Sequence, residues 1–278
     1  MCSDIRILLV DDFEVNRKIA RQHLLKGGYT VDLAADGQQA VDAFKQNRYD
    51  LILMDIDMPV MDGYEAANSI RKFEQNQLSH AGAAGQANAK SIPIIAMSGN
   101  AAIGEDTGLC LPGMDDCICK PFQRAELLEI VEKWIAGPQD TVNSKEIADA
   151  GSPPDEPQRD PQAPLDLKQA LREFMGKEGV LADVLRSFVE NGKECIKTAQ
   201  DALATGDYKR IQSQAHKLGG GAANLTAQKL ADVAFALEDA AQDEKLIQVR
   251  PLLQEFEQEF CQFETYLRQN AKLASLEE

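Results

Sequence analysis

The sequence has fewer basic than acidic residues, no long apolar run and no paired cysteine motif. Its 278 residues include 29 Lys and Arg against 45 Asp and Glu, which gives a net charge of −16. Binding to nucleic acid requires clustered basic residues, so this balance argues against a nucleic-acid partner. No apolar stretch approaches the ~20 residues of a membrane span, and the N-terminus lacks a secretory signal pattern. We therefore expect a cytoplasmic protein with no membrane span in this chain.

The six cysteines are scattered along the chain, with no C-x-x-C pair and no histidine at the spacing of a metal site. Cysteines of a cytosolic protein are ordinarily reduced thiols. We therefore expect neither a disulfide framework nor a zinc site.

Hydrophobic patterning divides the chain into three parts. Residues 1–137 alternate short apolar runs with helical patterns, which predicts five β-α units that form an α/β doubly wound parallel sheet. Residues 138–164 are rich in proline and acidic side chains, as is typical of a linker. Residues 165–278 show only helical periodicity, which predicts an all-α antiparallel helical bundle.

Most of the predicted strands end in a polar side chain that can carry chemistry. In chain order these side chains are Asp11, Asp12, Asp55, Ser98 and Lys120. The carboxyl ends of parallel strands lie at one edge of a sheet, so we expect these groups to converge. Converging carboxylates repel one another unless a cation is present, and oxygen ligands suit Mg²⁺. A hydroxyl and a lysine beside that cation can hold a phosphoryl group, whose transfer requires mainly positioning and charge neutralisation.

Residues 4–136 resemble the receiver domain of two-component response regulators. The matching segments are Asp11-Asp12, Asp55-Ile-Asp-Met-Pro-Val-Met-Asp-Gly63, Ile94-Ile-Ala-Met-Ser98 and Gly113-Met-Asp-Asp-Cys-Ile-Cys-Lys-Pro121. The resemblance implies a flavodoxin-like sheet with the strand order 2-1-3-4-5. It departs from the family at Cys117, where receivers usually carry an aromatic residue that swings inward on phosphorylation.

The resemblance to receivers also implies a role for each polar side chain of the strand ends. Asp55 would be the phosphoacceptor, and Ser98 and Lys120 would contact the phosphoryl oxygens. The implied ligands of Mg²⁺ are Asp11, Asp12, Asp55 and the backbone carbonyl of Asp57.

The predicted bundle carries a histidine on a helix with a clear apolar seam. The seam takes Ala215 and Leu218, so His216 lies about 100° away and is expected on an exposed flank, beside Gly219. The three glycines at 219–221 each cost about 1 kcal/mol relative to alanine in a helix. The seam nevertheless continues in register beyond them, which favours an unbroken helix and a steric reason for the glycines.

Residues 165–270 resemble a histidine phosphotransfer (HPt) domain, through the motif Ala215-His216-Lys-Leu-Gly-Gly220-Gly-Ala-Ala-Asn-Leu225. The resemblance implies that His216 is the phosphohistidine. The family usually has a lysine three residues after the histidine, where this chain has Gly219. Lys217 is expected to face elsewhere, because one residue is about 100° around the helix. The missing positive charge predicts that His216 holds a phosphoryl group weakly or accepts it slowly.

Together the two resemblances predict a phosphorelay protein. A histidine kinase upstream would phosphorylate Asp55, His216 would take over the group, and a response-regulator receiver downstream would accept it. The protein would be a phosphoryl-transfer intermediate rather than a turnover enzyme, since the chain has no glycine-rich nucleotide loop. Receiver and HPt domains also occur together at the C-terminal end of hybrid sensor kinases, so the chain could be a piece of one.

Two other functions are compatible with parts of the sequence. A non-catalytic interaction module is favoured by Cys117 and Gly219, the two departures from the family patterns. A phosphatase of the haloacid dehalogenase type would use an Asp-x-Asp such as Asp55-Ile-Asp57. Those enzymes place that motif on the first strand and the acidic pair last, which is the reverse of the order here.

Overall fold

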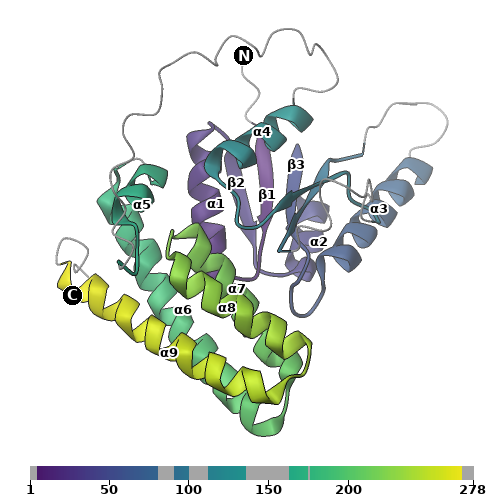
Figure 1. The fold of residues 1–278 in the computed structure, drawn as a ribbon. Coiled ribbons are helices and arrows are strands. Elements are labelled where there is room, and N and C mark those ends of the chain that lie inside the picture. Colours follow the sequence, from purple (N-terminus) through teal and green to yellow (C-terminus); the bar gives the residue numbers. More distant parts are fainter. Residues whose placement is uncertain (1–4, 81–90, 100–111, 136–162, 175, 271–278) are drawn as a thin grey trace.

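A computed structural model shows a sheet domain beside a helical bundle (Figure 1). The residues that it describes are 5–80, 91–99, 112–135, 163–174 and 176–270. The helix of the fourth predicted β-α unit, expected from about Ala101, and the predicted linker up to residue 162 lie outside these ranges. Among the described helices, none is both long enough and apolar enough to span a membrane.

Five parallel strands form the sheet of the first domain. They are β1 (Arg6–Val10), β2 (Thr30–Ala34), β3 (Leu51–Asp55), β4 (Ile94–Ser98) and β5 (Asp116–Cys119). Their order, β2-β1-β3-β4-β5, confirms the predicted topology. Every residue of β3 is buried, as expected of a central strand with helices on both faces. β3 pairs with β1 and β4, which places the carboxyl ends of these three strands next to one another.

The described helices of this domain cover both faces of the sheet. They are α1 (Glu14–Lys26), α2 (Gly37–Gln46), α3 (Gly63–His80) and α4 (Arg124–Ile135). Alternate residues of the strands point to opposite faces. In β3, Ile52 and Met54 pack toward α2 and α3, whereas Leu51 and Leu53 pack toward α1 and α4. The doubly wound arrangement is therefore as predicted.

The second domain is helical throughout its described length. Its helices are α5 (Leu167–Glu173), α6 (Glu178–Thr205), α7 (Tyr208–Asn224), α8 (Gln228–Gln242) and α9 (Leu246–Gln269). Short connections join each helix from α6 to α9 to the next one along the chain, and consecutive helices pack as antiparallel hairpins (Figure 1). Asp207 caps the N-terminus of α7, since its side chain accepts a hydrogen bond from the Arg210 N–H. The helix continues unbroken through the three glycines.

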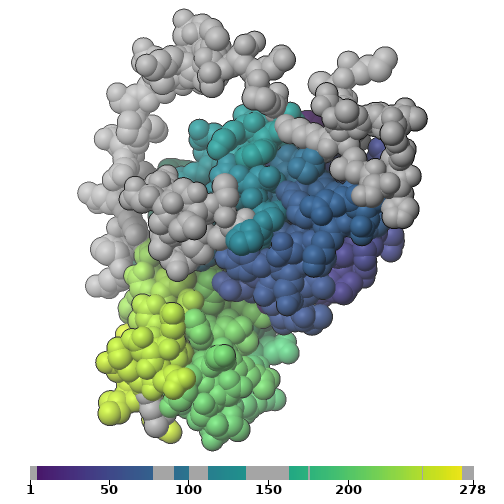
Figure 2. Space-filling model, turned by 90° about the vertical axis from the view of Figure 1, so that its right-hand side faces the viewer, coloured from purple at the N-terminus to yellow at the C-terminus, as the bar shows by residue number. Residues whose placement is uncertain are grey.

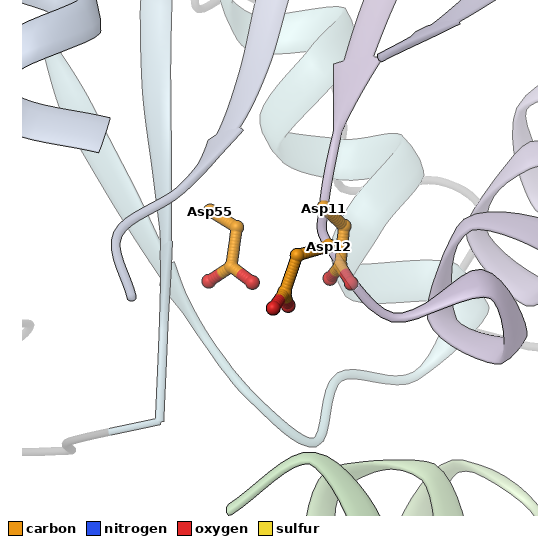
Figure 3. A group of neighbouring side chains, drawn as sticks. All are labelled: Asp11, Asp12 and Asp55. Carbon is orange, nitrogen blue, oxygen red and sulfur yellow. The ribbon is translucent and has the colours of Figure 1, made fainter. Parts of the chain in front are cut away.

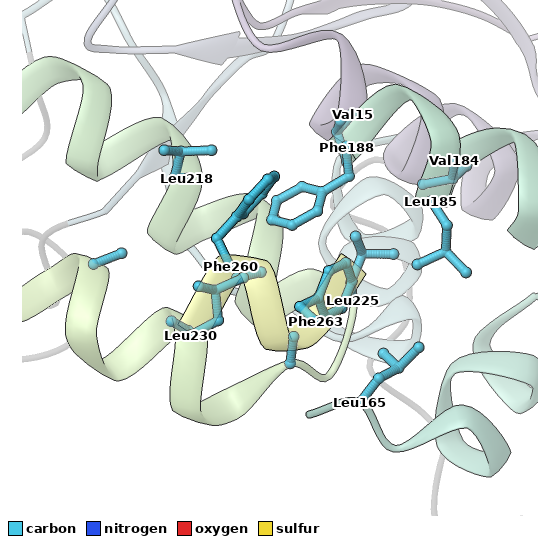
Figure 4. Packing of buried hydrophobic residues seen from close by; sticks show 14 of the residues in the cluster. Val15, Leu165, Val184, Leu185, Phe188, Leu218, Leu225, Leu230, Phe260 and Phe263 are labelled. Carbon is cyan, nitrogen blue, oxygen red and sulfur yellow. The ribbon is translucent and has the colours of Figure 1, made fainter. Parts of the chain in front are cut away.

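The two domains pack against each other through α1. Phe13, Val15 and Ile19 belong to the same apolar cluster as Phe188 of α6 and are almost completely buried. Val15 and Phe188 are labelled in Figure 4. The opposite face of α1 packs on the sheet. The space-filling view shows the surface of the bundle in direct contact with the first domain (Figure 2). One helix thus belongs to both cores, which no pattern in the sequence indicated.

Polar contacts border this shared apolar cluster. Asn224 at the end of α7 donates a hydrogen bond of 3.1 Å to the side-chain oxygen of Asn16. The Lys26 ammonium donates to the Glu173 carbonyl of α5 at 2.9 Å. These hydrogen bonds add to the apolar packing between α1 and the bundle.

Candidate functional site

Three carboxylates converge at the carboxyl ends of β1 and β3 (Figure 3). One oxygen each from Asp11, Asp12 and Asp55 lies within 4.8 Å of the other two. Asp11 and Asp55 are buried, and the Phe13 N–H donates to the Asp11 carboxylate at 2.8 Å. The convergence that the strand ends predicted is therefore present, and the cluster could bind a metal ion.

Lys120 reaches the same point from the end of β5. Its ammonium lies 2.7 Å from an oxygen of Asp11 and 2.8 Å from an oxygen of Asp55, and the side chain is buried. Ser98 is buried at the end of β4, where its carbonyl accepts a hydrogen bond of 2.6 Å from the Lys120 N–H. The pocket of the first domain thus combines three carboxylates, one ammonium and a hydroxyl-bearing residue at its edge.

Burial and charge shift the pKa values of these groups. Burial raises the pKa of Asp55 to about 7, although the neighbouring ammonium of Lys120 opposes the shift. Burial also disfavours the charged form of Lys120, but Asp11 and Asp55 together outweigh this and raise its pKa. A buried carboxylate that is costly to ionise gains more than an exposed one from a nearby cation. The donor set therefore fits a hard divalent cation such as Mg²⁺.

Two further predicted positions lie within or just after strands of the sheet. Asp57 lies two residues beyond β3 with an exposed side chain. Cys117 is half-buried in β5, opposite Ala96 of β4. It packs beside the apolar cluster between the sheet and the helices α2 and α3. The structure therefore has a small side chain where receivers usually carry the mobile aromatic.

His216 of α7 faces the pocket of the first domain rather than open solvent. Its Nδ1 lies 3.0 Å from an oxygen of Glu238 on α8. Burial lowers the pKa of His216, but Glu238 outweighs burial, so the pKa is raised overall. The charges of Lys120 and Asp55 also act on the imidazole. The exposed flank predicted for His216 is thus covered by the first domain.

The glycines after His216 allow close packing at two different surfaces of α7. A Cβ atom at Gly219 would lie 2.6 Å from the Phe235 ring of α8, inside the bundle. At Gly221 a Cβ would lie 2.6 Å from the ring of Phe13 in the first domain. The expectation that Gly219 lies on an open flank beside His216 is therefore wrong, because α8 occupies that side. The steric reason expected for the glycines is present at both positions.

Lys217 lies at the pocket, contrary to the expectation that it faces elsewhere. Its ammonium is 2.6 Å from Oδ2 of Asp12. The two groups form an ion pair but not a well-aligned hydrogen bond, since this buried oxygen has no partner of hydrogen-bond geometry. The step of about 100° around α7 was correct, but it turns Lys217 toward the first domain, because that domain covers more than one face of the helix.

Glu238 was not identified from the sequence. It lies 22 residues after His216 on the next helix, so the turn between α7 and α8 removes any relation by helical periodicity. Only the antiparallel packing of α7 and α8 brings the two side chains together. An acidic residue in the second half of the predicted neighbouring helix would have been the sole available signal.

Comparisons with known proteins identify both parts of the chain. Residues 7–132 match the Response regulator receiver domain family, and residues 183–269 match the Hpt domain family. Sensor protein GacS of Pseudomonas syringae pv. syringae is 29% identical over 77% of this chain and 22% of that protein. Signal transduction histidine-protein kinase BarA of Shigella flexneri is 30% identical over 77% of this chain and 21% of that protein. The chain thus spans about a fifth of the length of these relatives.

A solved structure also matches the first part of the chain. It is the receiver domain of sensor histidine kinase PA1611 from Pseudomonas aeruginosa PAO1, crystallised with a magnesium ion in its active site cleft. It is 42% identical and covers 48% of this chain and 99% of that chain. The TM-score is 0.39.

Proposed function

The chain carries a response regulator receiver domain followed by an Hpt domain, and from this premise we propose that it relays a phosphoryl group from Asp55 to His216. The observation that carries the proposal is the placement of His216 against the acidic pocket, within range of the charges of Asp55 and Lys120. The family matches to both domains support it independently. The resemblance of 77% of the chain to GacS and BarA agrees with a place at the end of a hybrid kinase.

Phosphorylation begins at Asp55. A carboxylate oxygen of Asp55 attacks the phosphorus of a phosphohistidine on an upstream histidine kinase, the new P–O bond forms, and the P–N bond to the kinase breaks. The ammonium of Lys120, 2.8 Å from Asp55, favours the ionised form of the attacking carboxylate against the effect of burial and then faces the phosphoryl oxygens. The hydroxyl of Ser98 is assigned to the same oxygens.

The acidic pocket is assigned to Mg²⁺. The ligands would be Asp11, Asp12, Asp55 and the backbone carbonyl of Asp57. When bound, the ion supplies positive charge that neutralises the phosphoryl oxygens during transfer. The receiver's own charges, three carboxylates and one lysine, leave a net charge of −2 that a divalent cation balances.

His216 takes the phosphoryl group in the second step. A hydrogen bond from Nδ1–H to Glu238 leaves the lone pair of Nε2 free to act as the nucleophile. Nε2 attacks the phosphorus, and the Asp55 carboxylate leaves with the electron pair of the broken P–O bond. His216 then donates the group to the aspartate of a downstream receiver.

Labelling of the whole chain with a small phosphodonor tests this function. With acetyl phosphate and Mg²⁺, mass spectrometry should find the phosphoryl group on Asp55 and, through it, on His216. Asp55→Asn should abolish both modifications, His216→Gln only the second, and Asp42→Asn, at an exposed acid of α2, neither. An unlabelled wild-type chain would instead favour the non-catalytic interaction module, which the small residue at Cys117 allows.

A further inference from the structure

Lys217 brings a second ammonium into the acidic pocket from the other domain. Lys120 contacts Asp11 and Asp55 but has no close contact with Asp12. The ammonium of Lys217 lies against Asp12, the remaining carboxylate. When the helical bundle is docked on the first domain, as in this structure, each of the three carboxylates therefore has an ammonium beside it.

Building on the metal site proposed above, we propose that Lys217 competes with Mg²⁺ for Asp12, so that docking of the HPt domain and metal binding oppose each other. The receiver alone presents three carboxylates and one ammonium, a net charge of −2. Docking adds Lys217 and leaves a net charge of −1. A divalent cation loses electrostatic attraction through this change, and it also loses Oδ2 of Asp12 as a ligand.

Burial makes this competition strong. The side chain of Asp12 is 5% exposed, and that of Lys217 is 19% exposed. Charges in such a position interact through an effective dielectric constant far below that of water, and salt screens them weakly. Lys217 cannot share Asp12 with a metal ion at low cost, because the two cations would stand a few ångströms apart without solvent between them.

Thermodynamic linkage makes the effect reciprocal: if docking weakens Mg²⁺ binding by some factor, Mg²⁺ weakens docking by the same factor. The apolar contacts of α1 with the bundle do not involve the pocket, so they continue to favour docking. A metal-loaded, unphosphorylated receiver would therefore expose Asp55 to a kinase more often than a metal-free one. Phosphorylation of Asp55 then adds negative charge to the pocket, which draws Lys217 back and with it His216.

Calorimetric titration of the whole chain with Mg²⁺ tests the competition. Lys217→Gln should tighten Mg²⁺ binding at least about tenfold, because it removes a full charge next to a ligand. Lys217→Arg keeps the charge and should bind Mg²⁺ as the wild type does. Equal affinities for the wild type and Lys217→Gln, both folded by circular dichroism, would overturn the inference and leave the proposed function intact. If neither the wild type nor any variant bound Mg²⁺, both the proposed metal site and this inference would be contradicted.

Hydrogen exchange provides the reciprocal measurement. Amides of α1 between Val15 and Ile19 should exchange faster in the wild type when Mg²⁺ is added, because part of the population undocks. The Mg²⁺-dependent change should be several-fold smaller in Lys217→Gln. The same acceleration in both chains would show that Mg²⁺ acts on α1 without Lys217, and would contradict the proposal.

Discussion

The imidazole of His216 lies directly against Gly99, so closely that a Cβ atom at residue 99 would stand 2.2 Å from Cε1 of the ring. Gly99 directly follows Ser98, the last residue of β4. At the point where His216 approaches, the edge of the acidic pocket therefore consists of backbone atoms without a side chain. A side chain at this position would hold His216 away from Asp55.

Gly99→Val should slow transfer from Asp55 to His216 by roughly 100-fold, because displacing a reacting group by about 1 Å can cost that much. The backbone of Gly99 is not left-handed, so valine fits its conformation and the fold should survive. Single-turnover transfer from the acetyl phosphate-labelled chain measures the rate. Labelling of Asp55 itself serves as the control and should remain at the wild-type level. Fast transfer in Gly99→Val would show that the observed docking is not the reactive arrangement.

Gly219→Ala should destabilise the protein, although alanine is the better helix former. The added methyl group would lie 2.6 Å from the ring of Phe235. Overpacking of this kind costs about 1–3 kcal/mol, against a gain of about 1 kcal/mol in helix propensity. Urea unfolding measures the difference in the free energy of unfolding, and Phe235→Leu should restore stability to the Gly219→Ala chain.

Gly219→Lys should slow phosphotransfer to His216 and not accelerate it. The lysine side chain would enter the bundle beside Phe235 and would not approach His216.

Glu238→Gln should shift the pH profile of transfer to His216 toward lower pH. Burial opposes protonation of His216 but Glu238 outweighs it, so the pKa is raised and the neutral, nucleophilic form appears only above that raised value. The rate should therefore increase with pH through the pKa of His216, and removal of the carboxylate should move this increase downward. Transfer rates measured from pH 5 to 9 give the two profiles. Superimposable profiles would rule out a role for Glu238 in the basicity of the histidine.

Transfer from Asp55 to His216 should occur within one molecule. For a random-coil linker of the length predicted at 138–164, chain statistics give a typical span of roughly 30 Å and an effective concentration on the order of millimolar. The shared packing of α1 with the bundle raises this further. The transfer rate should be independent of protein concentration. A mixture of Asp55→Asn and His216→Gln chains should gain little phosphohistidine, whereas efficient labelling in that mixture would demonstrate transfer between molecules.

Acid should weaken the fold through His23 of α1. Burial lowers the pKa of His23 from 6.5 to about 4. The centre of its ring lies 6.5 Å from that of Phe174, the residue that follows α5. The unfolded chain therefore takes up a proton below pH 6.5 that the folded chain resists, so stability is lost as the pH falls from 6.5 toward 4. By pH 5 this loss should reach about 2 kcal/mol. Urea unfolding at pH 7 and pH 5 should show it in the wild type and much less in His23→Leu.

The sequence by itself determined the order of the elements, the sheet topology expected from the resemblance and the convergence of Asp11, Asp12 and Asp55. The order of the strands in the sheet follows from the resemblance to receivers. The other two features follow from local periodicity together with one rule, that parallel strands end at the same edge of a sheet. The unbroken helix α7 could be predicted for a similar reason, because its apolar seam stays in register on both sides of the glycines.

Tertiary structure alone decided what each face of α7 meets. The angular position of Lys217 or Gly219 on the helix is a local property, but the group opposite it comes from another helix or from the other domain. Gly219 faces Phe235 because α8 folds back on α7, and Lys217 reaches Asp12 because α1 docks on the bundle. Such contacts join residues far apart in the chain, and their geometry depends on helix rotation and domain docking, which side-chain packing determines.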